Sequence, residues 1–299
     1  MRPVLVTGAG GQLGTELRRA AWPDGWQVVA VDQAELDLAD TAAIAATVAA
    51  GHDGAPFAAV INGAAYTAVD KAESDQVTAW AVNAMAPAAF GQACAAAGIP
   101  LVQVSTDYVF AGDKQGEWEP NDPVAPLGVY GASKLGGELA VRTSGARCAV
   151  VRTAWVVSAH GANFVKTMLR VGAERGTLRV VEDQHGSPTS AADLAAALVT
   201  ITVRLAEDAD APAGVYHFSN AGPTTWADFA REIFAQSHAK GGPSASVEGI
   251  PTSAYPTPAR RPANSLLSHA AITRDYGIRP RAWQAALSDI LDELLGDVA

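Results

Sequence analysis

The sequence of 299 residues predicts an α/β protein with a doubly wound parallel sheet. Two observations carry this prediction. Short runs rich in β-branched residues alternate with alanine-rich stretches of helical periodicity through the first half of the chain. A glycine-rich loop, TGAGGQLG, directly follows the first of these runs and opens the first helical stretch. Strand, helix and strand in this rhythm form a parallel sheet that helices cover on both faces.

The first half of the chain contains the predicted sheet. The first strand, at residues 4–7, leads through the glycine loop into a helix in which Leu13, Leu17 and Ala20 recur at helical spacing. A long buried helix, AWAVNAMAPAAFGQACAAAG, precedes the fourth strand, and a helix with the sequence SKLGGELAVRTS precedes the fifth. We expect the remaining strands at residues 27–32, 57–62, 100–106 and 148–155.

The second half of the chain is less regular. NFVKTMLRVGAER is expected to be helical, and RVVED a short strand. Ser190 with Asp193, and Thr225 with Asp228, resemble capping boxes that begin two further helices, with strand-like GVYHFS between them. The tail PRAWQAALSDILDELL is an amphipathic helix. Residues 238–265 are rich in proline, glycine and serine, and loops of this length are usually functional or disordered.

Composition and charge limit the class of protein. The net charge of −10 argues against nucleic acid or an anionic membrane as the main partner. Cys94 and Cys148 are expected to be two buried thiols in a reducing cytoplasm. The apolar run at the N-terminus is too short for a signal peptide, and no segment offers the roughly 18 apolar residues of a membrane span. We therefore expect a soluble cytoplasmic protein.

The glycine loop predicts a dinucleotide site. It spaces three glycines at intervals of three residues: Gly8, Gly11 and Gly14. Such a loop lets backbone N–H groups approach a pyrophosphate at a helix N-terminus. Asp32 ends the second strand, where a carboxylate can accept hydrogen bonds from an adenosine ribose. This carboxylate repels a 2′-phosphate and favours NADH over NADPH, although Arg18 and Arg19 are close enough in sequence to soften the preference.

The segment VYGASKLGGE predicts an acid for proton transfer. Tyr130 and Lys134 are four residues apart, so a helix places both on one face. A nearby ammonium group favours the phenolate, which lets the phenol pass its proton to an alkoxide. Thr106, in STDYVF at the end of the fourth strand, faces the same crevice and can hydrogen-bond the same oxygen. Taken alone, a Tyr–Lys pair also occurs on solvated helix edges.

Together, TGxxGxxG, Asp32, STDYVF and YxxxK resemble the extended short-chain dehydrogenase/reductase family. NGAAYTAVDKAE, DQHGSPT and AYPTPARRPANS are similar to segments of those members that reduce a dTDP-linked 4-keto sugar. The resemblance implies a Rossmann-type fold with a smaller C-terminal lobe and NADPH or NADH as cofactor. It implies a dTDP-linked 4-keto-6-deoxy sugar as substrate, which receives a hydride at C4 from the nicotinamide and a proton from Tyr130.

The resemblance also implies individual roles. The residues implied at the cofactor pyrophosphate are Gly8, Gly11, Gln12, Leu13 and Gly14, and those at the adenosine are Asp32, Asp37 and Leu38. The loop after the third strand contributes Ala64, Ala65 and Tyr66. The residues implied on the nicotinamide side are Val104, Ser105, Tyr130 and Lys134. For the sugar nucleotide, the implied roles fall on Thr106, Asp107, Trp155, Arg260 and Arg261, with the two arginines at the diphosphate. DKAE, at residues 70–73, is read as a solvated charge cluster.

The sequence predicts no metal site and leaves a homodimer open. The six histidines show no metal-ligand spacing. Some relatives in this family are described as binding magnesium through glutamates at a dimer contact. Glu16 could contribute to such a site, but Ala191 and Ala192 occupy the helix where another acid would be needed.

Two alternatives stay open beside this reductase. One is a reductase or epimerase of another nucleotide-linked 4-keto sugar, although the acid–base pair that epimerisation needs at C3 and C5 cannot be assigned. The other is a regulatory subunit that binds the cofactor without chemistry, although Tyr130, Lys134 and Thr106 are all present. Residues 1–155 are predicted to form the cofactor domain, which also receives segments from about 186–220. Residues 156–299 mainly form the sugar-nucleotide lobe.

Overall fold

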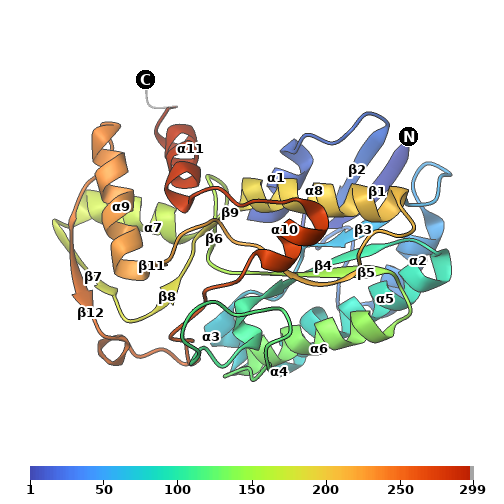
Figure 1. The fold of residues 1–299 in the computed structure, drawn as a ribbon, viewed down its shortest axis with the longest axis horizontal. Helices are drawn as coiled ribbons and strands as arrows, with labels where there is room; N and C mark the ends of the chain where they lie inside the picture. The colour runs from blue at the N-terminus through green and yellow to red at the C-terminus, as the bar shows by residue number, and fades with distance from the viewer. Residues whose placement is uncertain (297–299) are drawn as a thin grey trace.

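A central parallel sheet of six strands organises the computed structural model, which describes residues 1–296. The strand order is β10-β5-β4-β3-β1-β2 (Figure 1). The bounds are β1 Arg2–Thr7, β2 Trp26–Val31, β3 Ala59–Asn62, β4 Leu101–Thr106, β5 Cys148–Thr153 and β10 Gly214–His217. The doubly wound α/β fold class is therefore confirmed. The strand predicted in GVYHFS joins the edge of this sheet beside β5.

Helices cover both faces of the sheet because the strand side chains alternate between them. Val4 and Val6 of β1 pack into one core cluster, whereas Leu5 packs into the cluster on the opposite face. The first face carries α1 (Gln12–Arg19) and α8 (Ala191–Glu207), and the second carries α2 (Thr41–Ala50), α5 (Ala86–Ala97) and α6 (Val129–Thr143) (Figure 1). The carboxyl ends of the strands consequently meet at one edge between two helical layers.

A second, smaller core lies beside the sheet, at the left of Figure 1. Its elements are α7 (Phe164–Glu174), α9 (Trp226–Ala239) and α11 (Trp283–Leu295), packed on the parallel pair β7 (Thr177–Val181) and β12 (Ser246–Ile250). Two-residue strands connect this region to the sheet: β6 (Val156–Val157) with β9 (Thr189–Ser190), and β8 (His185–Gly186) with β11 (Thr224–Thr225). The division into two lobes stays a prediction, and its last three residues lie outside the described chain.

Local signals explain most helix starts in this half. The Ser190 side chain accepts a hydrogen bond from the backbone N–H of Asp193, and Thr225 does the same for Asp228, as the capping boxes predict. The segment 238–265 contains β12 and a short turn, η3 (Thr252–Ala254), and α10 (Ala270–Tyr276) follows it. Its reading as a stretch without regular structure was wrong at β12, because pairing with β7 supplies the hydrogen bonds that the sequence pattern does not reveal.

The long helix predicted at 79–98 is interrupted. The structure has α4 (Gln76–Trp80), one π-helical turn, η1 (Ala81–Met85), and then α5, while α3 (Val69–Ala72) precedes them and η2 (Asp107–Val109) follows β4. Asn83 lies in the π turn and is buried. Its side chain accepts from the backbone N–H of Tyr66 at 2.9 Å and donates to the Tyr66 carbonyl at 3.1 Å. The widened turn thus ties the loop after β3 to α5.

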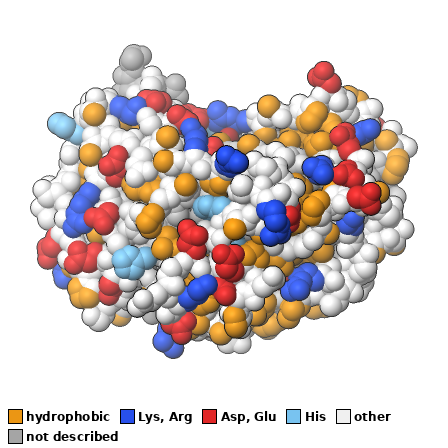
Figure 2. All heavy atoms as spheres, viewed as in Figure 1, with side chains coloured by type: hydrophobic (Ala, Val, Ile, Leu, Met, Phe, Trp, Pro, Cys, Tyr) orange, Lys and Arg blue, Asp and Glu red, His pale blue; other side chains and the backbone are white. Residues whose placement is uncertain are grey.

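The surface and the cysteines agree with the composition. On the face shown in Figure 2, Lys and Arg side chains are interspersed with Asp and Glu rather than gathered into one basic patch. Within residues 1–296, no helix combines the length and apolar character that crossing a bilayer requires. Cys94 and Cys148 are both buried as free thiols, as expected.

Candidate active site

Two adjoining cavities open at the carboxyl ends of the parallel strands, where ligands bind in open α/β sheets. The larger has a volume of about 790 Å³ and extends from the glycine loop to the N-terminal half of α6. The smaller, of about 330 Å³, lies past the end of β2. The two share Gly8, Asp32, Gln33, Ala64 and Ala65, so they form one continuous site with two ends.

The structure brings most of the sequence-predicted residues to this site. The larger cavity is lined by Gly8, Gly11, Gln12, Leu13, Gly14, Asp32, Ala64, Ala65, Val104, Ser105, Thr106, Asp107, Tyr130, Lys134 and Trp155. Asp37, Leu38 and Tyr66 line the smaller one. Arg260 and Arg261 line neither of the two.

The glycine loop fits a pyrophosphate. Gly8 has φ +84°, a left-handed conformation that favours glycine. A Cβ on Gly14 would lie 2.0 Å from the Gly8 carbonyl oxygen, so only glycine allows this close approach of helix and strand. Helix α1 begins after Gly11. Glycine has no side chain, so it cannot cap the first backbone N–H groups of the helix. Those groups remain available to an anion.

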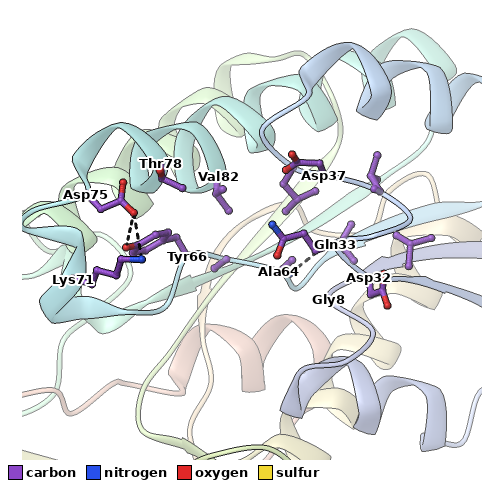
Figure 3. Close-up of a pocket in the computed structure, with 15 residues that line it drawn as sticks. Gly8, Asp32, Gln33, Asp37, Ala64, Tyr66, Lys71, Asp75, Thr78 and Val82 are labelled. Carbon is purple, nitrogen blue, oxygen red and sulfur yellow. Dashed lines mark hydrogen bonds and ion pairs between the residues drawn. The ribbon is translucent and has the colours of Figure 1, made fainter.

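The adenosine end is acidic and solvent-exposed. Asp32 Oδ1 accepts hydrogen bonds from the backbone N–H groups of Ala34 at 2.8 Å and Glu35 at 3.2 Å. The Asp37 carboxylate similarly accepts from Ala39 at 2.9 Å. Figure 3 shows Asp32 and Asp37 beside the cavity that Gly8 and Ala64 close from the other side. Both carboxylates therefore shape their own turns while they face the site.

Cations contribute little at this end. Arg19 was expected to soften the repulsion of a 2′-phosphate, but its guanidinium donates to Glu293 at 2.7 Å, and neither Arg18 nor Arg19 lines the two cavities. The basic residue that lines the smaller cavity is Lys71, whose Nζ lies 3.8 Å from the Asp75 carboxylate (Figure 3). Tyr66 donates its hydroxyl to that carboxylate at 3.1 Å.

At the opposite end, α6 and β4 bring the polar groups together. The Lys134 Nζ donates to the Val104 carbonyl at 2.8 Å, and the Thr106 hydroxyl donates to Asp107 Oδ1 at 3.0 Å. Thr106 also lies close enough to the phenol of Tyr130 to act on its pKa. Tyr130 and Lys134 thus share one helix face toward the cavity, as the YxxxK spacing predicts.

Burial governs the ionisation of these groups. Desolvation raises the pKa of Tyr130 to about 12; the neighbouring Thr106 opposes this rise and the charge of Asp107 adds to it. Burial lowers the pKa of Lys134 to about 8 and raises that of Asp107 to about 6. The protein's own groups therefore do not lower the pKa of Tyr130, contrary to the expectation from the Tyr–Lys spacing. The cause is that desolvation of the phenol outweighs its favourable contacts.

Trp155 stands at the sugar side in a strained backbone conformation, with φ +50°. Its ring stacks on that of Trp226 at 3.7 Å between centroids, and the planes are 16° apart. Trp226 begins α9, so the smaller core holds one wall of the larger cavity.

Sequence reasoning missed two features near the site. Asp70, read as part of a solvated cluster, accepts from the Arg261 guanidinium at 2.7 Å and from the backbone N–H of Ala259 at 3.1 Å. It therefore ties the proline-rich segment to α3. Asn83 was also missed, although a lone asparagine in an alanine-rich helix was an available signal.

Glu16 lies in a cluster on the outer face, away from both cavities. Its carboxylate is 3.3 Å from His160 Nε2, and His160 is 3.4 Å from Glu293. Arg19 lies 3.9 Å from Glu16 and also forms an ion pair with Glu293, so its guanidinium neutralises part of the charge of both carboxylates.

Comparisons with known proteins agree with this geometry. Residues 1–295 match the family model described as RmlD substrate binding domain. The dTDP-4-dehydrorhamnose reductase of Burkholderia thailandensis is 43% identical over 299 residues, covering 98% of this chain and 99% of the relative.

Two solved structures share the whole fold. The crystal structure of the Clostridium acetobutylicum dTDP-4-dehydrorhamnose reductase has a TM-score of 0.90 and 34% identity, covering 98% of this chain and 99% of that one. The Bacillus anthracis enzyme of the same name, in complex with NADP, has a TM-score of 0.89 and 33% identity, covering 98% and 100%. The chain therefore belongs to the dTDP-4-dehydrorhamnose reductase family, within the extended short-chain dehydrogenases/reductases.

Proposed function

We propose that the protein reduces the C4 ketone of dTDP-4-dehydro-L-rhamnose to give dTDP-L-rhamnose, using NADPH or NADH. The relatives that match nearly end to end carry the name of this reaction, and one solved relative contains NADP. The observation that carries the proposal is the convergence of Tyr130, Lys134 and Thr106 in the cavity that begins at the glycine loop. This convergence supports Tyr130 as the proton donor at the point where a reduced nicotinamide would meet a ketone.

The glycine loop and the uncapped start of α1 support a role in binding the pyrophosphate, and Asp32 and Asp37 a role at the adenosine. A reduced nicotinamide, when bound, supplies a hydride to the carbonyl carbon. Tyr130 would hold its proton at the carbonyl oxygen and release it as that oxygen becomes an alkoxide. The high pKa of the phenol suits an acid that must stay protonated until then.

Lys134 and Thr106 would orient Tyr130 and the ketone. Lys134, with a pKa lowered to about 8, is still mostly an ammonium group at neutral pH. Trp155 would close over the sugar and exclude water, and Asp107 would contact it beside Thr106. The roles of Arg260 and Arg261 at the diphosphate also stay proposals, as does a cytoplasmic location, and a homodimer stays open.

The test is NADH or NADPH oxidation, followed by absorbance with and without dTDP-4-dehydrorhamnose. We expect oxidation that requires the sugar and falls at least about a hundredfold in Tyr130→Phe, because the general acid is lost. Tyr255→Phe, on an exposed tyrosine, is the matched control and should keep full activity. Tight cofactor binding without turnover on any keto sugar would instead support the regulatory subunit.

A further inference from the structure

A fully buried ion pair lies one helical turn behind Lys134. Glu138 is 0% exposed and Arg152, on β5, is 2% exposed. The guanidinium binds the carboxylate in a bidentate fashion, Nε to Oε1 at 2.9 Å and Nη2 to Oε2 at 2.7 Å. Burying two charges costs several kcal/mol, and a well-packed apolar pair often stabilises a fold better. Stability alone is therefore a weak reason for these two residues to be charged.

The carboxylate makes a third contact, and it leads to the active site. The Ser105 hydroxyl donates to Glu138 Oε1 at 2.5 Å. Ser105 lies on β4 between Val104, whose carbonyl accepts from Lys134, and Thr106, which lies close enough to Tyr130 to act on its pKa. Glu138 therefore accepts a hydrogen bond from Ser105, the β4 residue that lies between the two that contact Lys134 and Tyr130.

Arg152 fixes the carboxylate in turn. Its guanidinium also donates to the Pro120 carbonyl at 3.1 Å and lies over the Phe110 ring at 4.9 Å from the centroid. His217 approaches it at 3.4 Å, and burial lowers the pKa of this histidine to about 3, so it brings no second positive charge at neutral pH. Arg152 of β5 thus fixes the orientation of the Glu138 carboxylate, which accepts its third hydrogen bond from Ser105 of β4.

Charge gives a second link to Lys134. Burial lowers the pKa of Lys134, and the negative charge of Glu138 opposes that shift. The other ionisable groups on α6 are Tyr130 and Arg142, and those on the elements packed against it are Asp70, Lys71, Glu73, Cys94, Asp107, Tyr108, Cys148 and Arg152. Among the described residues, Glu138 is the one whose charge acts on the pKa of Lys134.

We propose that Glu138 is a positioning residue for the reductase reaction: locked by Arg152, it sets the end of β4 against Tyr130 and Lys134 and places a carboxylate one helical turn from Lys134. This inference rests on the function proposed above. Glu138 does not line either cavity, so it acts through Ser105 and Lys134 rather than on the substrate.

The test uses variants that remove the charges of Glu138 and Arg152 while they keep the side chains at a similar size. Glu138→Gln keeps the size of the side chain but leaves Arg152 buried without a counter-ion, which is expected to weaken the fold. The double variant Glu138→Gln/Arg152→Met removes both charges, and the methionine can pack on Phe110. Glu207→Gln, in the exposed ion pair with Arg2, is the matched control for a Glu-to-Gln change.

The readouts are the pH dependence of NADH binding, followed by fluorescence titration, and of kcat/KM for the sugar nucleotide. In the wild type both should fall as the pH rises past about 8, where Lys134 loses its proton. In the double variant the fall should begin at a lower pH, because the carboxylate that raises the pKa of Lys134 is gone. The Glu207→Gln profile should match the wild type.

A folded double variant whose basic limb stays at the wild-type position overturns the role of the charge. Ser105→Ala tests the strand contact without disturbing the ion pair, and we expect kcat to fall about tenfold while the thermal midpoint changes little. An unchanged kcat in Ser105→Ala overturns the role of the contact. Because NADH binding is measured without sugar, a protein that turned over no keto sugar would refute the proposed function and leave the binding test intact.

Discussion

The charged groups are buried at one end of the site and exposed to solvent at the other. At the catalytic end, Thr106, Lys134 and Glu138 are at most 5% exposed, and the pKa of Lys134 is displaced to about 8. At the adenosine end, Asp32 and Asp37 are exposed, and each carboxylate caps its own turn. Charges in a buried site act strongly on one another, whereas exposed charges are screened by water and salt. Substitutions should therefore cost orders of magnitude at one end and small factors at the other.

The largest expected effect tests the buried end. Lys134→Ala removes the charge beside Tyr130 and the proposed ribose contact, so kcat/KM should fall about 10²- to 10⁴-fold. Thr106→Ala removes a hydroxyl beside Tyr130 that would hydrogen-bond the ketone, and a loss of about tenfold is expected. Steady-state kinetics on both variants measures the difference. Equal losses would contradict the separate roles assigned to the two residues.

A second prediction concerns the glycine loop, which joins the two ends. In Gly14→Ala the new Cβ would lie 2.0 Å from the Gly8 carbonyl oxygen, so the loop must shift. Such overpacking costs about 1–3 kcal/mol, which corresponds to an NADH dissociation constant raised about tenfold or more. The matched control is Gly176→Ala, because Gly176 lines neither cavity and a Cβ there meets open space. Calorimetric titration that gives both variants the same affinity would refute this reading of the loop.

The sequence predicted the sheet and most of the site because both depend on local patterns. The strands of the first half are apolar runs, and the glycine loop, STDYVF and YxxxK each lie within a few residues of a strand end or on one helix turn. Helix α2 was not predicted, because its alanine-rich sequence is apolar on every side and shows no amphipathic periodicity.

What the sequence could not provide depends on contacts between distant segments. The bond from Ser105 to Glu138 spans 33 positions, and the ion pair from Arg261 to Asp70 spans 191. The spacing of Tyr130 and Lys134 predicted their common face but not the desolvation that raises the phenol's pKa, since burial follows from the packing of η2 and β4 on α6. Patterns thus predicted which groups meet, and the structure was needed for their charge states.

A third prediction concerns Arg261, which lines neither cavity. Within residues 1–296, its Nη1 is buried without a hydrogen-bond partner while Nη2 binds Asp70, so one half of the guanidinium has a donor left for a phosphate oxygen of a bound sugar nucleotide. Arg261→Gln should raise the KM for the sugar nucleotide about tenfold and change that for the cofactor little. The exposed Arg260 should matter less, and Arg260→Gln is the matched comparison. If Asp70→Asn raises the KM as much as Arg261→Gln does, the arginine only anchors the segment and does not bind diphosphate.

The smallest expected effect lies at the exposed end. Asp32→Ser removes the carboxylate that would face a 2′-phosphate, but the serine hydroxyl can still accept from the Ala34 N–H and keep the turn. The wild type should prefer NADH, and the variant should shift the ratio of kcat/KM values toward NADPH by about fivefold, the size of one exposed charge interaction. Asp40→Ser is the matched control, because Asp40 also caps a backbone turn but lies outside both cavities. The shift should shrink in high salt, since an exposed charge is screened. An unchanged ratio, or a shift that salt leaves untouched, would place the origin of cofactor choice in groups other than this carboxylate.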